Sequence, residues 1–482
     1  MNPTRSSFLF SFAEKYTLLM LTTVGAMVLS RLLTPADIGV YSIGAVLVGL
    51  AQVVRDFGVG LYVIQEKELT PDKLRAAFST SLAVAWLLAA LVLLLSSPVA
   101  QFYHEPRLRL VLRLLAVNFL LIPFSSITLP YLRRQMRFSA LYVINATNSL
   151  AQLVCSLLLV WRGYGYLSLV WAALAGTLAA LLISLRFRPA AMPWLPGWRG
   201  MGRLLSFGAL STGAGVIDEA GVAAPDLIIG KLIGVTGVGM FSKAMGALNV
   251  FNQLITSAIS PVIFPLYASH AHTGGDLRQA YLTTVSYMTA LAWPFFGFLA
   301  VLAQPIVHLL YGDQWDAAVP LIRIMSLSCA VYSMFSMARY LFVAMGEVKA
   351  QAKLDTLAVP VRVIAVLLAA PFGLPSVAWA VVAGALFRSW LTFACLARLT
   401  GLGWMDLLLA VRRSALLTAL TLAGPLLVSA LLPIRPEHGL TTVLVAAVST
   451  ALLWLLGIAV FRHEVLVEWQ WVRRKPSDLP VK

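Results

Sequence analysis

The stretch Arg31–Ser42, "RLLTPADIGVYS", separates two long apolar runs, and a similar stretch, Lys231–Ser242, "KLIGVTGVGMFS", follows 200 residues later. Each contains a basic residue, two aliphatic residues and a turn, followed by glycine, an apolar residue, an aromatic residue and serine. A basic residue that ends one helix, and a glycine that lets the next begin in close contact, predict a short connection between helices. Its recurrence predicts two copies of one helical unit.

The composition places the chain in a lipid bilayer. Of its 482 residues, 60% are hydrophobic and 12% are charged, whereas soluble domains average about 45–50% apolar and 25% charged. The first apolar run carries Glu14 and Lys15 and has no small-residue cleavage site, which predicts a membrane span rather than a cleavable signal peptide. The cysteines, Cys155, Cys329 and Cys395, lie inside apolar runs without metal-binding spacing, so we expect ordinary core residues.

Apolar runs of about 20 residues, each ended by a polar break, predict an all-α integral membrane protein of about fourteen transmembrane helices. The predicted ranges are 9–31, 36–64, 75–97, 108–132, 138–161, 166–185, 204–229, 236–264, 280–310, 318–344, 350–371, 374–397, 411–432 and 440–461.

The basic residues support this count and predict the orientation. With the N-terminus inside, the cytoplasmic segments hold 22 lysines and arginines and the outer loops hold 6. This bias follows the positive-inside rule, and one missed helix would invert every later loop. We therefore expect both termini in the cytoplasm. The net charge of +16 is explained by topology, so we expect no nucleic-acid partner.

Two further matches extend the internal repeat. "VWAALAGTL" (170–178) matches "AWAVVAGAL" (378–386) at an offset of 208, and "LVLRLL" (110–115) matches "PLIRIM" (320–325) at an offset of 210. Each copy comprises six helices. Because six is an even number, both copies have the same orientation in the membrane. The predicted organisation is an N-lobe at 1–186, a cytoplasmic linker at 187–203, a C-lobe at 204–398, two added helices at 399–462 and a cytoplasmic tail at 463–482.

Polar residues inside the predicted spans are the candidate functional residues, because each embedded charge costs about 2.5–3.5 kcal/mol on insertion scales. Gln52, Arg55 and Asp56 share one helix face. A second polar face holds Asn249, Asn252, Gln253 and Thr256, and a third holds Ser211, Gly215, Asp218, Glu219 and Asp226. Lys15 and Lys243 are further embedded cations.

Structural explanations stay open for several of these charges. Arg113 and Arg323 lie near outer helix ends, where their heads can reach the lipid headgroups, and Arg339 lies near an inner end. Asp355 and Arg362 are seven residues apart and suit a structural polar network. For Lys15, Arg55 and Asp56, a structural explanation of this kind competes with a functional one. Adjacent and mid-span, Asp218 and Glu219 are the best candidates for a titrating or ion-linked site.

Catalytic patterns do not occur in the sequence. It contains no phosphate-binding GxxxxGK[ST], no HExxH and no GxSxG, and its six histidines are scattered over loops and helix ends. We therefore expect a protein that is not an enzyme and has no resident cofactor or metal.

Five stretches resemble the Wzx-like polysaccharide transporter family, within the multidrug/oligosaccharidyl-lipid/polysaccharide exporter superfamily. They are "SRLLTPADIGVYSIG" (30–44), "RDFGVGLYVIQEKELTPDKLRAAF" (55–78), "PDLIIGKLIGVTGVGMFSKA" (225–244), "ISPVIFPLYA" (259–268) and "LLYGDQWDAAVPLIRIM" (309–325). The resemblance implies two six-helix lobes arranged as a V around a central cavity that opens alternately to either side.

The resemblance also implies the cargo: an oligosaccharide linked through diphosphate to polyprenol, moved to the outer leaflet of the bacterial inner membrane. Related lipid II flippases have two extra helices that shape a groove for the lipid tail, as the last two helices here are expected to do. Cations suit a diphosphate, so Lys15, Arg55 and Lys243 are its candidate ligands. Gln52, Asn249, Asn252 and Gln253 are candidates for binding sugar hydroxyls. The acidic pair Asp218 and Glu219 argues against simple electrostatic capture of an acidic glycan.

Two alternatives remain. An ion-coupled drug or cation exporter of the same superfamily would use Asp56, Asp218 or Glu219 to bind its solute in exchange for H⁺ or Na⁺, which are also the candidate coupling ions of a flippase. A membrane scaffold for glycan synthesis would gain nothing from embedded charges. Expected partners are the lipid-linked oligosaccharide, membrane lipids, and the polysaccharide polymerase and export machinery.

Overall fold

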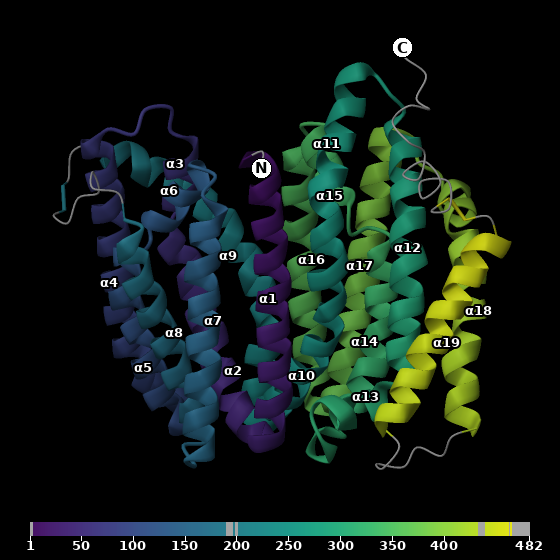
Figure 1. Ribbon diagram of the computed structural model, residues 1–482, viewed down its shortest axis with the longest axis horizontal. Helices are drawn as coiled ribbons and strands as arrows, with labels where there is room; N and C mark the ends of the chain where they lie inside the picture. The colour runs from purple at the N-terminus through teal and green to yellow at the C-terminus, as the bar shows by residue number, and fades with distance from the viewer. Residues whose placement is uncertain (1–2, 189–195, 198–200, 432–438, 462, 465–482) are drawn as a thin grey trace. The chain divides into compact units, whose positions relative to one another are not determined.

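The computed structural model describes residues 3–188, 196–197, 201–431, 439–461 and 463–464, with side chains except those of 3–14, 201–207, 209–211 and 214. Helices are the regular structure of this part of the chain, which contains no strand, and the predicted all-α class is confirmed (Figure 1). The predicted linker at 187–203 and tail at 463–482 lie mostly outside the described residues.

Every predicted range overlaps a helix, but some bounds differ: the helix expected to end at 264 ends at Thr273, and the helix expected to begin at 411 begins at Trp404. In chain order the helices are α1 Pro3–Leu32, α2 Pro35–Asp56, α3 Val59–Gln65, α4 Pro71–Phe102, α5 Arg107–Leu121, α6 Thr128–Arg134, α7 Phe138–Trp161, α8 Leu167–Arg186, α9 Met201–Leu232, α10 Val235–Phe251, α11 Ser257–Thr273, α12 Leu277–Val301, α13 Ala303–Leu310, α14 Ala318–Ser333, α15 Ala338–Ala344, α16 Val348–Ala369, α17 Leu374–Thr400, α18 Trp404–Leu431 and α19 Gly439–Val460.

The helices have the length and the surface of membrane spans. Within the described residues, 11 helices are long and apolar enough to cross a bilayer, or up to 12 if a pair of helices bent by 46° within 107–134 forms one span. Helices α1 and α9 are 30 and 32 residues long, and the total of fourteen spans stays a prediction. Leu87 and Leu94 on α4 are more than two-thirds exposed, as expected of residues that face lipid.

The chain divides into two compact units, residues 1–242 and 243–482, and similar helix pairings occur in each. In the first unit α4 packs on α5, α5 on α8, and α7 on α8; in the second α12 packs on α14, α14 on α17, and α16 on α17. Helix α9 belongs to the first unit, because it packs on α2 and α4. The sequence repeat starts its second copy at α9, and the predicted lobe boundaries stay a prediction.

One repeated motif positions a glycine against a neighbouring helix in each unit. A Cβ on Gly176 of α8 would lie 2.4 Å from Gln152 Cγ and 2.5 Å from Asn148 Oδ1, both on α7. A Cβ on Gly384 of α17 would lie 3.1 Å from Arg362 Cγ on α16. These glycines therefore make room for polar side chains between paired helices. The Ala-Gly pair shared by the repeated stretches 170–178 and 378–386 thus has a packing role.

The turn that opens the sequence repeat is built as predicted. Arg31 lies in the last turn of α1, and Lys231 in the last turn of α9. Thr34 caps α2: its Oγ1 accepts a 3.1 Å hydrogen bond from the backbone N–H of Asp37, whose carboxylate accepts one from the Thr34 N–H. This capping box fixes the start of α2 directly after the turn.

Four predicted helices contain breaks that the apolar pattern does not reveal. The range 36–64 divides at Phe57 and Gly58, which both adopt left-handed backbone conformations with φ of 36° and 65°. The Phe57 ring fills the space beside Gly208 of α9, where a Cβ would lie 2.2 Å from the ring, so tertiary packing holds this break. The ranges 108–132, 280–310 and 318–344 are interrupted at 122–127, at 302 and at 334–337.

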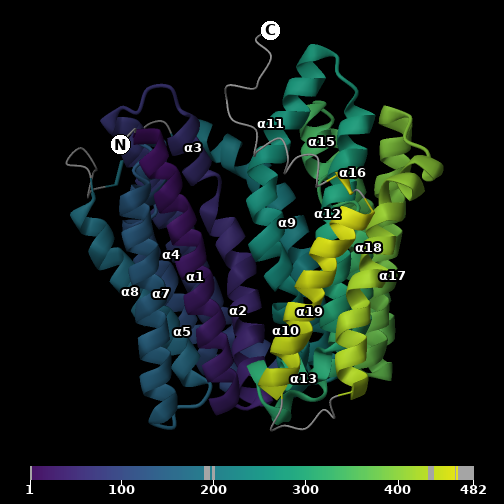
Figure 2. The same cartoon turned by 45° about the vertical axis from the view of Figure 1, so that its right-hand side comes forward.

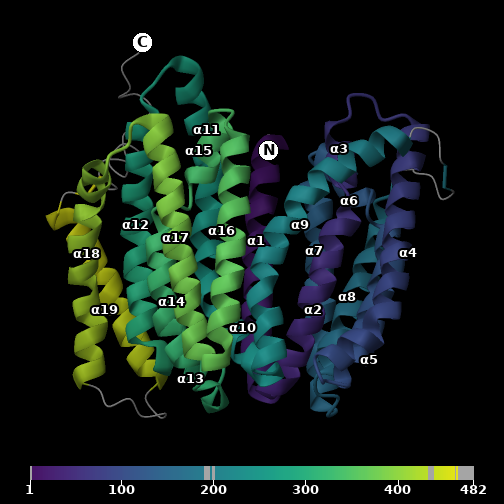
Figure 3. The same cartoon turned by 180° about the vertical axis from the view of Figure 1, so that it is seen from behind.

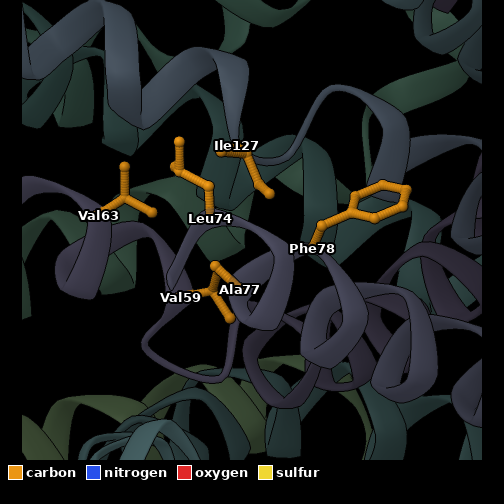
Figure 4. Close-up of a cluster of buried hydrophobic side chains, with 6 residues drawn as sticks. All are labelled: Val59, Val63, Leu74, Ala77, Phe78 and Ile127. Atoms are coloured by element: carbon orange, nitrogen blue, oxygen red, sulfur yellow. The ribbon is translucent and has the colours of Figure 1, made fainter. Parts of the chain in front are cut away.

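A hydrophobic cluster within the first unit holds the short helix α3 in place. Val59 and Val63 of α3 pack with side chains from α4 and with Ile127 (Figure 4). The α4 members are Leu74, Ala77 and Phe78, and all six cluster residues are at most 4% exposed. Burial of this apolar face compensates for the hydrogen bonds lost at the helix break.

Arg134 ties the end of α3 to α6. Its guanidinium donates to the carbonyl oxygens of Val63 at 3.0 Å and Lys67 at 3.1 Å, and also to that of Glu66. The last carbonyls of a helix have no partner within the helix. Arg134 therefore supplies the missing donors at the broken end of the second span.

The last two helices dock on α12 through a buried polar network. α18 packs on α12 and α19 (Figure 2). Thr289 of α12 donates to Ser414 Oγ of α18 at 2.9 Å, and His463 Nε2 lies 3.2 Å from the same oxygen. Burial, with the positive charge of Arg413, lowers the pKa of His463 below its ordinary value. A neutral imidazole is thus favoured at this junction.

Helices α16 and α17, side by side in Figure 3, are joined by an ion pair inside the second unit. Arg388 Nη2 lies 2.7 Å from Asp355 Oδ1, and Gln351 donates to Asp355 Oδ2 at 2.8 Å. The guanidinium also lies over the Tyr332 ring of α14, 5.9 Å from its centroid. Asp355, expected in a structural network with Arg362, therefore pairs with Arg388.

Replacing Arg134 by Ala should lower the free energy of unfolding by about 2–3 kcal/mol, because the carbonyls at the end of α3 lose their donors. Thermal unfolding of the detergent-purified protein measures this change. Arg133→Ala is the matched control, since Arg133 is the exposed neighbour on the same helix, and it should change stability by less than about 0.5 kcal/mol. Equal effects of the two substitutions would contradict the role given to Arg134.

Asp355→Asn should destabilise the second unit, because it leaves the Arg388 guanidinium without its counter-ion inside a membrane span. The double variant Asp355→Asn/Arg388→Gln should recover part of the loss, with a coupling energy of about 1–3 kcal/mol between the two sites. Unfolding of the two single variants and the double variant measures that coupling. Strictly additive effects would show that the pair contributes nothing to stability.

Candidate functional site

The first polar face lies at the end of α2, in the first unit. Gln52 and Asp56 are exposed, while the Arg55 side chain is only 14% exposed. Arg55 Nη2 lies 2.6 Å from Asp56 Oδ1. Its Nε is buried without a hydrogen bond in the structure. The stripe thus offers a cation whose hydrogen-bonding capacity is incompletely used.

Acidic residues of α9 meet this helix. A Cβ on Gly215 would lie 3.2 Å from Val53, and a Cβ on Gly49 would lie 3.9 Å from Glu219 Oε1. Glu219 is therefore next to α2, one helical turn from Gln52. Asp218 and Glu219 are both half-buried, and Asp226, two turns further on, has an Oδ1 that is buried without a hydrogen bond in the structure. The structure thus places Glu219 beside α2, while the joint site of Asp218, Glu219 and the α2 stripe stays a prediction.

Lys15 is the predicted cation that the structure does not join to this group. It lies half-buried on α1, which packs along α7. Among the described residues, no hydrogen bond or ion pair joins Lys15 to the α2 stripe. Its proposed contact with a diphosphate stays a prediction.

The second polar face lies in the second unit, where α10 ends. Asn249, Asn252 and Gln253 are all exposed, and their spacing puts them on one side of the helix. A π-helix over Asn252–Thr256 follows α10, and Thr256 Oγ1 donates to Asn252 Oδ1 at 3.1 Å. Phe251, buried, packs against Phe295 and Phe296 of α12. Such π-bulges inside helices are frequent at functional sites.

Lys243 lies between two aromatic rings. Its Nζ is 5.2 Å from the centroid of the Tyr311 ring and 5.5 Å from that of Trp315. Both rings are buried, and both belong to the "LLYGDQW" segment after α13. A cation over aromatic faces is stabilised electrostatically. This segment therefore holds the Lys243 side chain in place.

The structure adds partners that the sequence did not predict. Gln351 could have been found, because it is four residues from Asp355 on the same helix. Tyr311 and Trp315 could not, since no short-range pattern links them to Lys243. Within the described residues, no group of three or more His, Cys, Asp or Glu side chains could hold a metal ion.

Comparison with known proteins identifies the family. Residues 28–320 match the family described as polysaccharide biosynthesis protein. The teichuronic acid biosynthesis protein TuaB of Bacillus subtilis (strain 168) is 23% identical over 290 residues, which are 58% of each chain. The succinoglycan biosynthesis transport protein ExoT of Rhizobium meliloti (strain 1021) is 24% identical over 308 residues, 62% of this chain and 61% of ExoT.

The matches span about three-fifths of the length of these relatives. The fold is similar to that of the lipid II flippase MurJ in its inward closed conformation, with a TM-score of 0.78 and 12% identity over 95% of this chain and 100% of that one. The chain thus shares the fold of that protein, and the family match covers more than half of the chain. The chain belongs to the polysaccharide biosynthesis protein family.

Proposed function

We propose that this protein is a flippase. It moves an oligosaccharide linked through diphosphate to a polyprenol from the cytoplasmic to the periplasmic leaflet of the bacterial inner membrane, for export of a surface or extracellular polysaccharide. The family match and the fold shared with a lipid II flippase support this assignment. The mechanism is alternating access of a cavity between two lobes, without enzymatic chemistry.

The observation that carries the proposal is the exposed amide face of Asn249, Asn252 and Gln253 within the candidate span 235–273. Polar side chains facing hydrocarbon would each lose hydrogen bonds to water at a cost of several kcal/mol. Their exposure within this candidate span is therefore explained by a water-filled cavity. Amides donate and accept hydrogen bonds, so this face suits sugar hydroxyls.

The cations would bind the diphosphate. Arg55 offers a planar guanidinium with a buried, unused Nε, and a diphosphate would compete with Asp56 for its other nitrogens. Lys243, held by Tyr311 and Trp315, would provide a fixed ammonium group. The polyprenol chain needs no such cavity, because it can stay in the surrounding lipid. The groove for that chain between the last two helices stays a proposal.

Ion coupling is part of this proposal. Asp56, Asp218 and Glu219 are the candidate carboxylates, and H⁺ or Na⁺ is the candidate ion. The contact between Glu219 and α2 at Gly49 supports their joint action, since movement of α9 along α2 would change the surroundings of this carboxylate. The same acidic residues favour the alternative of a drug or cation exporter. The polymerase and export machinery remain proposed partners.

Removal of the protein should make the lipid-linked oligosaccharide accumulate in the cytoplasmic leaflet, because its sugar-diphosphate head cannot cross hydrocarbon unaided. Labelling of the two leaflets with a membrane-impermeant sugar reagent measures the distribution. Plasmid-borne wild-type protein should restore it. Normal periplasmic glycan in a strain without a second flippase, combined with new sensitivity to cationic drugs, would instead favour the exporter.

Arg55→Ala should slow translocation about 10- to 100-fold, the equivalent of losing a charged hydrogen bond of about 1.5–3 kcal/mol. Lys243→Ala should act in the same direction. Both are assayed in proteoliposomes as protection of labelled lipid-linked oligosaccharide, at matched protein levels. Arg137→Ala, an exposed arginine in the turn before α7, is the control and should keep the wild-type rate. Unchanged flux in either variant would remove that residue from the proposed site.

A further inference from the structure

The two copies of the repeated turn are in direct backbone contact within the first unit. A Cβ on Gly39 would lie 1.7 Å from the carbonyl oxygen of Val235, and a Cβ on Gly239 would lie 2.1 Å from the carbonyl oxygen of Pro35. Real side chains cannot occupy either position without displacing the opposite backbone. Glycine at both positions thus allows the start of α2 to cross the start of α10 at minimum separation.

The contact is symmetric in sequence. Val235 is 200 positions after Pro35, Gly239 is 200 positions after Gly39, and Ser242 is 200 positions after Ser42. Each glycine meets the residue four positions before its counterpart, and Ser42 Oγ donates to Ser242 Oγ at 3.4 Å. Reciprocal contacts of this kind are those of a two-fold axis between like surfaces.

We infer that this crossing is the outer gate of the transporter, closed in this conformation. The inference rests on the proposed function. The basic residues predict both turns at the outer face, and the sugar-diphosphate head has to leave by that face. Backbone atoms in van der Waals contact leave no passage between the two turns. The start of α10 therefore has to part from α2 during each cycle.

The chemistry of the crossing suits a contact that opens and closes. The meeting groups are uncharged, and their hydrogen bond of 3.4 Å is at the long limit for hydroxyls. Parting them exposes two hydroxyls and peptide groups that water can satisfy at the membrane surface. By contrast, the start of α2 is attached to its own bundle by charge, since Asp37 lies 3.7 Å from the Arg107 guanidinium at the start of α5.

A second contact on this face ties the end of α9 to α4. Lys231 Nζ donates to the Phe102 carbonyl at 2.5 Å, lies 3.3 Å from His104 Nδ1, and is 4.5 Å from the Phe102 ring centroid. This attachment holds the later turn against the earlier bundle while the gate is closed. The charged groups near the crossing thus include Asp37, Arg107 and Glu105 beside α2, and Lys231 at the end of α9.

The gate is tested with a disulfide across it. Ser42→Cys/Ser242→Cys, in a background with Cys155, Cys329 and Cys395 replaced by Ala, should oxidise readily because the two hydroxyls are already adjacent. Translocation in proteoliposomes should fall below about a tenth of the reduced rate and recover after reduction. The control is Ser81→Cys/Ser126→Cys, whose hydroxyls lie 2.8 Å apart within the first six predicted spans, and whose oxidation should leave transport unchanged.

Oxidised Ser42→Cys/Ser242→Cys protein that transports at the reduced rate would overturn the gate and make the crossing a fixed pivot. Failure to form the disulfide would contradict the contact itself. A measurement without cargo separates this inference from the proposed function. Spin labels on the same two cysteines should give one short and one long distance population in lipid if the crossing opens. A single short population would overturn the gate, even in a protein that flips no lipid.

Discussion

Every backbone N–H and C=O group in the hydrocarbon must find its partner inside the protein, and the remaining features of this structure follow from that constraint. Unbroken helices meet it without help. The broken spans need side chains as partners, and the structure supplies them. Arg134 donates to the end of α3, and Tyr281 OH donates to the Met334 carbonyl at 2.9 Å, where α14 ends. Trp293 Nε1 donates to the Ala330 carbonyl one turn earlier.

The duplicated architecture is unequal in charge, and this inequality gives the two polar faces different chemistry. Gln52 and Asn252 occupy corresponding positions, yet Ile255 and Thr256 stand where the first copy has Arg55 and Asp56. One copy therefore presents an ion pair and the other neutral amides. A cargo that joins a diphosphate to a neutral or acidic glycan has the same two-part chemistry.

The sequence predicted the helices well because a membrane span is determined by its own composition. The range 138–161 is recovered at both ends as α7. The break at Phe57 was not predictable, since its left-handed conformation depends on contact with Gly208, 151 positions away. The candidate site, like the helices, could be predicted only in part. Embedded polar residues stand out in any apolar run, but the aromatic rings around Lys243 and the pairing of Asp355 with Arg388 are long-range contacts.

The crossing of the two turns explains why this stretch is still recognisable in both copies. A reciprocal contact needs the same small residue on both sides, because a Cβ at either glycine would meet the backbone carbonyl of the other copy. The polar faces carry no such mutual requirement, since the proposed binding of different parts of one cargo does not need α2 and α10 to resemble one another. Self-complementarity therefore acts on the turns alone. A duplicated helical bundle can diverge along its binding surface and still keep matched surfaces where its copies touch.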